Sequence, residues 1–480
     1  MATANGAGYR YGVSDQAFYI PVVARALDPA AFPRDAALID AQGRLMLSDE
    51  ALAAVVGATG WGLDWVFLGV YVLSALLVWG GLSLIGARVY RSAWVTAALV
   101  AAFTLRHRIT RTSANSLEPY FHPRMLAFGL GLLAIAALLR RRLWLAVGLV
   151  AVAAAVHVTT ALWFAVLVGV AILTLDRRWR LTVLPLLAAG VAGAAWAFGG
   201  GILEGRLQTM DAVWLQAVAT KDSLFASQWP VSAWVANLGL LGALWAAHLY
   251  RRRSGASTAE DAALVWGTTA LVGVFLLTLP AVSAGVAFFV QLQIPRVFWL
   301  VDAVATIYVI GAVARGQDGT RRRAVTLAVV LCLVAVGRGL FVMLVERPDR
   351  SLFAVHLPAD PWQDAMGWVA RQDAGAHVLA DPGHAWKFGT SVRVSGERDV
   401  LIEEVKDSAV AIYSRDVAAR VVERTEAVGD FSTLTSEHAG ALAMRYDLDY
   451  LVTVAEMPML RQVYQNPQFR VYSLADAVSR

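Results

Sequence analysis

The sequence contains very little cysteine. Its 480 residues include a single cysteine, Cys332, which lies inside an apolar run. One thiol cannot form a disulfide within the chain, and it cannot build a metal site from several thiolates. Cysteine usage therefore gives no information about the redox compartment.

Charged residues are also scarce. They make up 16% of the chain, and hydrophobic residues make up 58%, whereas soluble domains contain about 25% charged and about 45–50% apolar residues. The apolar excess gathers in runs of roughly 17 to 25 residues, the length with which a helix crosses a hydrocarbon core. This pattern excludes an ordinary soluble enzyme and predicts a polytopic α-helical membrane protein.

The net charge of +5 does not indicate a nucleic-acid partner, because most arginines stand in short clusters between apolar runs. The first 60 residues contain no run that could serve as a secretory signal or membrane anchor. We therefore expect membrane entry to begin with the helix near Trp61.

About ten membrane spans are predicted, and the second to fifth of them are short. Their expected ranges are 62–86, 92–105, 125–139, 143–157, 159–175, 181–199, 233–250, 262–281, 296–314 and 324–345.

Arginine placement predicts the orientation of these spans. Clusters such as Arg140–Arg142 and Arg251–Arg253 occupy alternate loops, which the positive-inside rule places in the cytoplasm. Both termini are then extracytoplasmic, and the number of spans is even. One outer loop breaks the rule with a basic cluster at Arg106, His107, Arg108, Arg111 and Arg124. Either this loop is a functional site, or the short second span is misplaced.

Three regions follow from this pattern. Residues 1–61 form a first extracytoplasmic loop with an amphipathic helix, residues 62–345 form the transmembrane domain, and residues 346–480 form a soluble extracytoplasmic α/β domain. The last region alternates short predicted strands and helices, which is typical of a small sheet covered by helices. It contains no GxGxxG, no P-loop and no nucleophile elbow, so it shows no catalytic motif.

Two acids stand out in the first region. Ser14 is expected to cap a helix that runs to about Leu27, which places Asp15 in its first turn. The helix N-terminus favours an ionised carboxylate there, suited to a general base or a metal ligand. An ordinary helix-start aspartate is the alternative. Asp35, in the turn-like segment FPRD, is a second candidate.

The loop before the third span contains the segment EPYFHPR. Glu118 and His122 lie four residues apart and would share a face if a helical turn were present, with Arg124 beside them. Pro119 and Pro123 argue against a regular helix. A loop packed on the membrane surface is the alternative to a binding site.

Two further polar residues are predicted at the outer ends of spans. His157, next to Thr159 and Thr160, is either an interhelical histidine bonded to threonine or part of a cavity. Arg296, which opens the ninth span, could bind a phosphate through its planar fork of donors. The alternative is that the Arg296 side chain snorkels to ordinary lipid headgroups.

The layout resembles the GT-C superfamily of membrane glycosyltransferases, through an outer first loop with an acidic residue, many spans and an extracytoplasmic C-terminal domain. The segments YGVSDQAFYIPVVARALDPAAFPRD, HPR and HVTTALWF look like those of uncharacterised bacterial membrane proteins related to that superfamily. The resemblance implies a protein of the bacterial cytoplasmic membrane. It would transfer a sugar from a polyprenyl-phosphate donor to a cell-envelope acceptor at the outer face.

Roles are carried over from the resemblance by position. Asp15 would be the general base, and Arg296 with Arg124 would hold the donor phosphate. His122 and His157 would line the cavity, and Asp35 and Glu118 are kept as substrate-binding candidates.

The sequence departs from the family pattern in two ways. No span precedes the first outer loop, and Asp15 is followed by Gln16 instead of a second acid. The missing acid leaves open whether a divalent metal takes part. The competing interpretation is a non-catalytic transporter or an assembly partner in envelope polysaccharide export.

Overall fold

The computed structural model describes residues 1–43, 46–315 and 321–475, and the chain divides into two compact units. Unit 1 comprises Met1–Tyr9, Gly69–Thr209 and Asp222–Leu352. Unit 2 comprises Arg10–Leu68, Met210–Lys221 and Phe353–Arg480.

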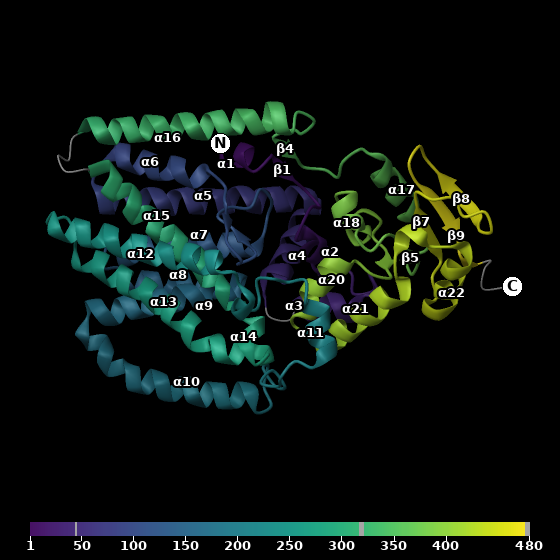
Figure 1. The fold of residues 1–480 in the computed structure, drawn as a ribbon, viewed down its shortest axis with the longest axis horizontal. Coiled ribbons are helices and arrows are strands. Elements are labelled where there is room, and N and C mark those ends of the chain that lie inside the picture. The colour runs from purple at the N-terminus through teal and green to yellow at the C-terminus, as the bar shows by residue number, and fades with distance from the viewer. Residues whose placement is uncertain (44–45, 316–320, 476–480) are drawn as a thin grey trace. The chain divides into compact units, whose positions relative to one another are not determined.

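Unit 1 is a bundle of long apolar helices (Figure 1). Its helices of ten residues or more are α5 (Leu63–Tyr90, which begins in unit 2), α6 (Ala93–Thr104), α7 (Pro123–Leu138), α8 (Leu143–Val156), α9 (Val158–Leu175), α10 (Val183–Phe198), α12 (Val231–Arg253), α13 (Ala259–Ser283), α15 (Val297–Arg315) and α16 (Arg321–Phe341). Each lies on one of the ten predicted runs.

Length separates these helices into two classes. Seven helical stretches of the described chain are long and apolar enough to cross a membrane, while α6, α7 and α8 are apolar but shorter. The chain is therefore a helical polytopic membrane protein. A count of ten spans remains a prediction.

Close helix packing and buried ion pairs hold the bundle together. Gly267 of α13 lies against the backbone of α9, since a Cβ there would stand 2.3 Å from the Leu167 carbonyl oxygen. At the ends that carry the basic connectors, Arg251 donates to Asp261 at 3.2 Å, and Tyr308 donates to the same carboxylate at 2.8 Å. Arg141 pairs with Glu260. These arginines thus have structural partners as well as a predicted topological role.

Unit 2 contains a five-stranded mixed sheet with the strand order β6-β5-β7-β9-β8. The strands β5 (His377–Leu379), β6 (Asp399–Val400) and β7 (Tyr450–Thr453) are parallel, and β8 (Arg461–Gln465) and β9 (Arg470–Ser473) join antiparallel. The helices of this unit include α2 (Gln16–Leu27), α3 (Ala36–Gly43), α4 (Ser48–Thr59), α11 (Ala212–Val218), α17 (Pro361–Val369), α19 (Val392–Ser395), α20 (Glu404–Ala411), α21 (Arg415–Val428) and α22 (Ser436–Tyr446).

The sheet core forms on the apolar face of α17. Trp362, Met366 and Val369 of this helix are all buried with Val378 and Phe469. Asp360 caps the helix by accepting from the Gln363 backbone N–H at 2.8 Å.

One local expectation for unit 2 is wrong. Helix α2 starts at Gln16, and Asp15 instead of Ser14 is its N-cap residue, because Ser14 adopts a positive φ of 55°. Trp214 of α11 is buried, and its indole N–H donates to the Ala411 carbonyl at 2.7 Å.

Candidate functional site

The loop between α6 and α7 folds into a small hairpin, in which β2 (Arg108–Ile109) pairs with β3 (Ala114–Asn115). Acidic residues from other helices and loops of unit 1 neutralise part of its basic cluster. His107 contacts Asp302 at 3.0 Å, and Arg111 pairs with Asp222. The hydrogen bond to Asp302 raises the pKa of His107. Acidic side chains of the fold therefore neutralise part of the basic cluster that departs from the positive-inside rule.

Glu118 is the acidic centre of this loop. It is buried, and its carboxylate accepts from Arg124, from Arg106 at 3.4 Å and from the Asn115 amide at 3.1 Å. No helical turn joins Glu118 to His122, because the chain from residue 117 to 122 is irregular. Glu118 therefore orients guanidinium groups and is not paired with His122 on a helical face.

His122 and His157 occupy equivalent places on two helices. His122 is the N-cap of α7 and accepts from the Arg124 backbone N–H at 3.2 Å through Nδ1. His157 is the N-cap of α9 and accepts from the backbone N–H and hydroxyl of Thr160 at 3.3 and 3.0 Å. A bond from His157 to threonine was expected between helices, but Thr160 belongs to α9 itself, so the contact is a local N-cap bond. The two rings lie 6.2 Å apart, centroid to centroid.

Positive charge surrounds His157. The imidazole is buried, and its neighbours include His122, Arg124 and Arg296. A neutral imidazole that accepts through Nδ1 carries its proton on Nε2, so it can donate there.

Arg296 reaches this region from another segment. It ends a short 3₁₀ turn, Ile294–Arg296, directly before α15, and the preceding Gln293 adopts a positive φ of 49°. Trp299, one turn into α15, donates to the Ser116 carbonyl at 3.4 Å and stacks on Phe128 at 4.2 Å. These contacts fix the start of α15 against the loop that carries Glu118.

Unit 1 thus brings together five predicted residues, which we call the histidine–arginine cluster: Glu118, His122, Arg124, His157 and Arg296. Guanidinium forks and Nε2–H donors suit an anion with several oxygens, such as a phosphate. Among the described residues, no group of three or more His, Cys, Asp and Glu side chains is arranged to hold a metal ion.

Asp15 lies in unit 2. Its carboxylate accepts from the Lys406 ammonium at 3.1 Å, and its side chain is 27% exposed. Lys406 also lies over the Phe18 ring at 5.2 Å. Burial lowers the pKa of the neighbouring Lys221 to about 8, and the charge of Lys406 adds to this effect. No local pattern pairs Asp15 with Lys406, which lies 391 residues later in the chain.

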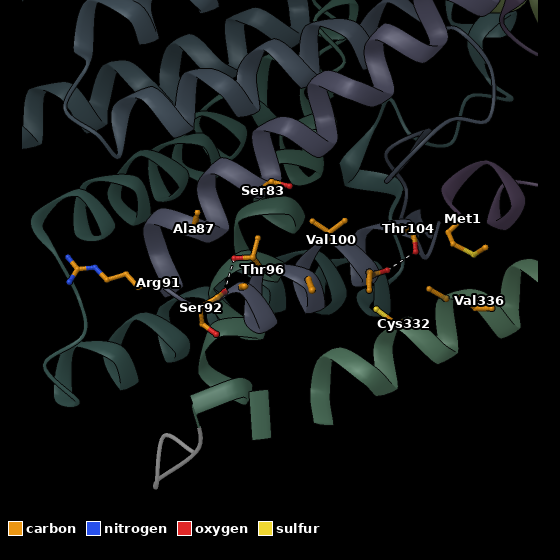
Figure 2. A pocket seen from close by; sticks show the side chains of 14 residues that line it. Met1, Ser83, Ala87, Arg91, Ser92, Thr96, Val100, Thr104, Cys332 and Val336 are labelled. Atoms are coloured by element: carbon orange, nitrogen blue, oxygen red, sulfur yellow. Dashed lines mark hydrogen bonds between the residues drawn. The ribbon is translucent and has the colours of Figure 1, made fainter. Parts of the chain in front are cut away.

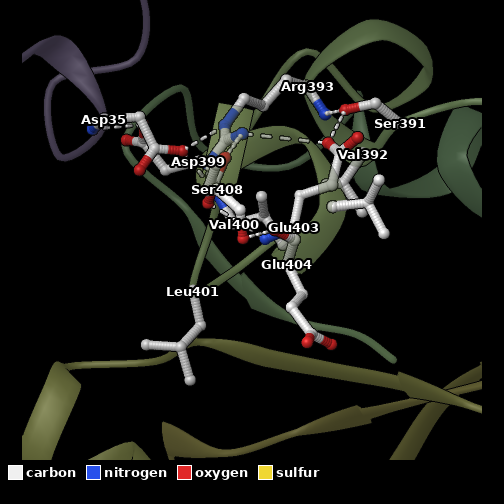
Figure 3. A network of polar contacts seen from close by, with 12 residues as sticks. Asp35, Ser391, Val392, Arg393, Asp399, Val400, Leu401, Glu403, Glu404 and Ser408 are labelled. Atoms are coloured by element: carbon white, nitrogen blue, oxygen red, sulfur yellow. Dashed lines mark hydrogen bonds and ion pairs between the residues drawn. The ribbon is translucent and has the colours of Figure 1, made fainter. Parts of the chain in front are cut away.

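Asp35 lies in a buried network of ion pairs. It is fully buried, and its carboxylate binds Arg393 at 2.7 Å (Figure 3). The same carboxylate also pairs with Arg420. Burial alone would raise the pKa of Asp35, but the two guanidinium groups hold it well below its usual range. Substrate binding was expected of Asp35, but these contacts account for its carboxylate without a ligand.

Arg393 organises the remainder of this buried network. Its guanidinium also binds Asp407 at 2.6 Å, and Ser391 donates to Glu403 at 2.6 Å (Figure 3). Next to Asp35, burial raises the pKa of Asp399 to about 6, and the charge of Asp35 adds to this shift. Sequence reasoning missed these residues because a lone arginine in SVRVS carries no motif.

Comparison with solved structures shows a structural likeness. No protein-family model and no curated protein sequence matches the chain. A cryo-EM structure of the arabinofuranosyltransferase AftD from Mycobacteria is similar to it with a TM-score of 0.47 and 15% sequence identity, over 98% of this chain and 39% of that chain. The chain therefore spans about two fifths of the length of that structure.

Proposed function

We propose that this protein is a GT-C-like glycosyltransferase that moves a sugar from a polyprenyl-phosphate donor to a cell-envelope acceptor at the outer face of the bacterial cytoplasmic membrane. The observation that carries the proposal is the histidine–arginine cluster. It gathers phosphate-binding side chains at helix ends of a membrane-embedded bundle.

The cluster suits the leaving group of such a reaction. Glu118 binds both Arg106 and Arg124, which fixes the direction of the guanidinium groups before a ligand arrives. Fixed cationic donors stabilise charge that develops as a bond to phosphate breaks. Arg296 and the Nε2–H groups of the two histidines would bind the same phosphate oxygens.

The reaction is a direct displacement. A base removes the proton of the acceptor hydroxyl, and the acceptor oxygen bonds to the anomeric carbon. The bond from that carbon to the phosphate oxygen breaks, and its electron pair leaves with the polyprenyl phosphate. The resemblance to GT-C enzymes assigns the base to Asp15. The Lys406 ammonium, 3.1 Å from the Asp15 carboxylate, would hold this carboxylate in place.

The phosphate role is tested by replacing Arg296 in protein reconstituted with polyprenyl-phosphate sugars. A charged hydrogen bond contributes about 1.5–3 kcal/mol, so Arg296→Gln should lower transfer by roughly 10- to 100-fold and raise the KM for the donor. Arg142→Gln, an exposed arginine between α7 and α8, is the matched control and should leave transfer unchanged.

The same assay separates the two competing functions. Transfer by the wild type that survives Asp15→Asn at full rate would remove Asp15 as the base while keeping the enzyme. If the wild type transfers no sugar from any polyprenyl-phosphate donor, the non-catalytic transporter or assembly partner is the better description.

A further inference from the structure

Unit 1 contains a second feature that the proposed reaction does not use. A groove of about 760 Å³ runs between α5, α6 and α16 (Figure 2). Its lining is mostly small and apolar, and consists of Met1, Ser83, Ala87, Arg91, Ser92, Ala93, Thr96, Ala97, Val100, Ala101, Thr104, Cys332, Ala335 and Val336.

The groove follows one face of α6. Ala93, Ala97, Ala101 and Thr104 recur at three- and four-residue spacing, so their side chains line one side of the helix. The opposite face, with Ala98 and Leu99, is fully buried in the bundle. Since the groove-facing residues are small, α6 and α16 leave a channel where leucines would fill the space.

The length of the groove fits one acyl chain, which covers about half of the hydrocarbon core. It extends from Ser92 to Thr104, which at 1.5 Å per residue is about 18 Å of helix. Half of a hydrocarbon core is about 15 Å thick. An apolar channel at this depth has too few polar partners to hold ordered water.

One end of the groove is cationic. Arg91 is exposed, and it has no hydrogen bond or ion pair with any residue in the described parts of the chain. By contrast, Arg88, Arg141 and Arg251 of the same and neighbouring basic connectors each pair with Glu260 or Asp261. Helix α6 also begins here at its N-cap Ser92, which adds the positive end of a helix dipole.

We propose that this groove binds one acyl chain of an anionic glycerophospholipid, with the lipid phosphate at Arg91. The small side chains of α6 accept the acyl chain, and Arg91 selects a negative headgroup over a zwitterionic one. Basic pockets between membrane helices on the cytoplasmic side recognise anionic lipids in this way, and arginine placement predicts that Arg91 lies on that side.

The test uses the full chain in phosphatidylcholine nanodiscs that contain a little phosphatidylglycerol with a photoreactive acyl chain. After irradiation, mass spectrometry maps the cross-linked peptides. Cross-links should concentrate on residues 93–104 and 332–336, and unlabelled phosphatidylglycerol should compete with the probe. Additional phosphatidylcholine should not compete.

Two pairs of variants separate the headgroup from the acyl chain. Arg91→Gln should lower the cross-linking yield about fivefold, while Arg252→Gln, an exposed arginine on another basic connector, should leave it unchanged. Ala97→Phe should fill the groove and displace the probe, while the exposed Ala243→Phe on α12 should not.

Equal competition by phosphatidylcholine, or an unchanged yield in Arg91→Gln, would overturn the proposal. Displacement of the probe by polyprenyl phosphate at a concentration where phosphatidylglycerol has no effect would also overturn it, because the groove would then bind a prenyl chain. None of these results depends on sugar transfer, so the proposed enzymatic function stands or falls separately.

Discussion

Histidine is an uncommon helix N-cap, yet two histidine caps lie side by side in the candidate site. Serine, threonine, aspartate and asparagine are the preferred caps because their short oxygens reach the first-turn N–H groups. His122 and His157 accept first-turn N–H groups through Nδ1. The Nε2–H of each ring takes no part in the cap. Capping alone would not require an imidazole, so the second nitrogen is the reason to look for a ligand.

Two substitutions of His157 separate capping from binding. Asn retains a cap, whereas Ala costs about 0.5–2 kcal/mol of stability. We expect both variants to lose roughly 10-fold or more in sugar transfer, because each lacks the Nε2 donor. Only His157→Ala should also show a lower Tm. Full transfer by His157→Asn would show that the ring is only a cap.

Asp35 illustrates the opposite case, a buried acid with a structural role. Asp35→Asn leaves Arg393 and Arg420 without their shared carboxylate, and breaking a buried pair in this way costs about 3–5 kcal/mol. We therefore expect a clear decrease in the Tm of the full chain in detergent, followed by tryptophan fluorescence.

The matched control makes the same chemical change at a surface pair. Asp40 is 49% exposed and binds Arg25 at 3.0 Å, and such pairs contribute about 0–1 kcal/mol. Asp40→Asn should leave the Tm nearly unchanged. Equal Tm values for the two variants would show that Asp35 does not stabilise unit 2.

At the scale of elements, α4 carries a buried acid in its first turn. Asp49 is 2% exposed, and its contact is the Ser48 hydroxyl at 3.4 Å. Burial raises the pKa of Asp49 to about 7, and the charge of Glu50 adds to the shift. Because the folded pKa lies above the unfolded value of 3.8, the protonated carboxyl stabilises the fold. This contribution is present below pH 4 and is lost as the pH rises through about 7.

Asp49→Asn should remove that pH dependence. The Tm of the variant should match the wild type near pH 4 and exceed it near pH 8, because the amide stays neutral. Glu50→Gln, at an exposed neighbour on the same helix, should change the difference between the two pH values much less. A wild-type Tm advantage at pH 8 would contradict the raised pKa of Asp49.

The sequence predicts some elements well and others poorly, for physical reasons. Long apolar runs identify the bundle helices because a helix in hydrocarbon must satisfy its own backbone. Strand β8 was not expected, since RQVYQ is polar and largely exposed and so lacks an apolar alternation. The apolar start of VLIEEV is typical of a strand, yet the strand ends at Val400 and α20 starts at Glu404.

The sequence also predicts some contacts of the candidate site residues and not others. Five predicted residues of unit 1 gather in the histidine–arginine cluster, because all stand next to the ends of apolar runs. The partners of Asp15 and Asp35 in unit 2 could not be predicted from the sequence. Arg393 binds Asp35 across 358 positions, and no local pattern specifies a contact at that separation.

At the scale of the whole molecule, the orientation of the chain is a prediction that arginine placement makes and that chemical labelling can check. Alternate basic loops predict that residues 251–258 face the cytoplasm and that residues 200–232 and the C-terminal region face outward.

Replacing Cys332 by serine removes the only native thiol. Single cysteines at the exposed positions Ser254, Thr220 and Ser432 then report each side. On intact cells, a membrane-impermeant maleimide should label Thr220→Cys and Ser432→Cys but not Ser254→Cys, and permeabilisation should expose all three. Labelling of Ser254→Cys on intact cells would reverse the orientation and move the histidine–arginine cluster to the cytoplasmic face. An external sugar acceptor would then be excluded, while the phosphate-binding chemistry of the cluster would be unchanged.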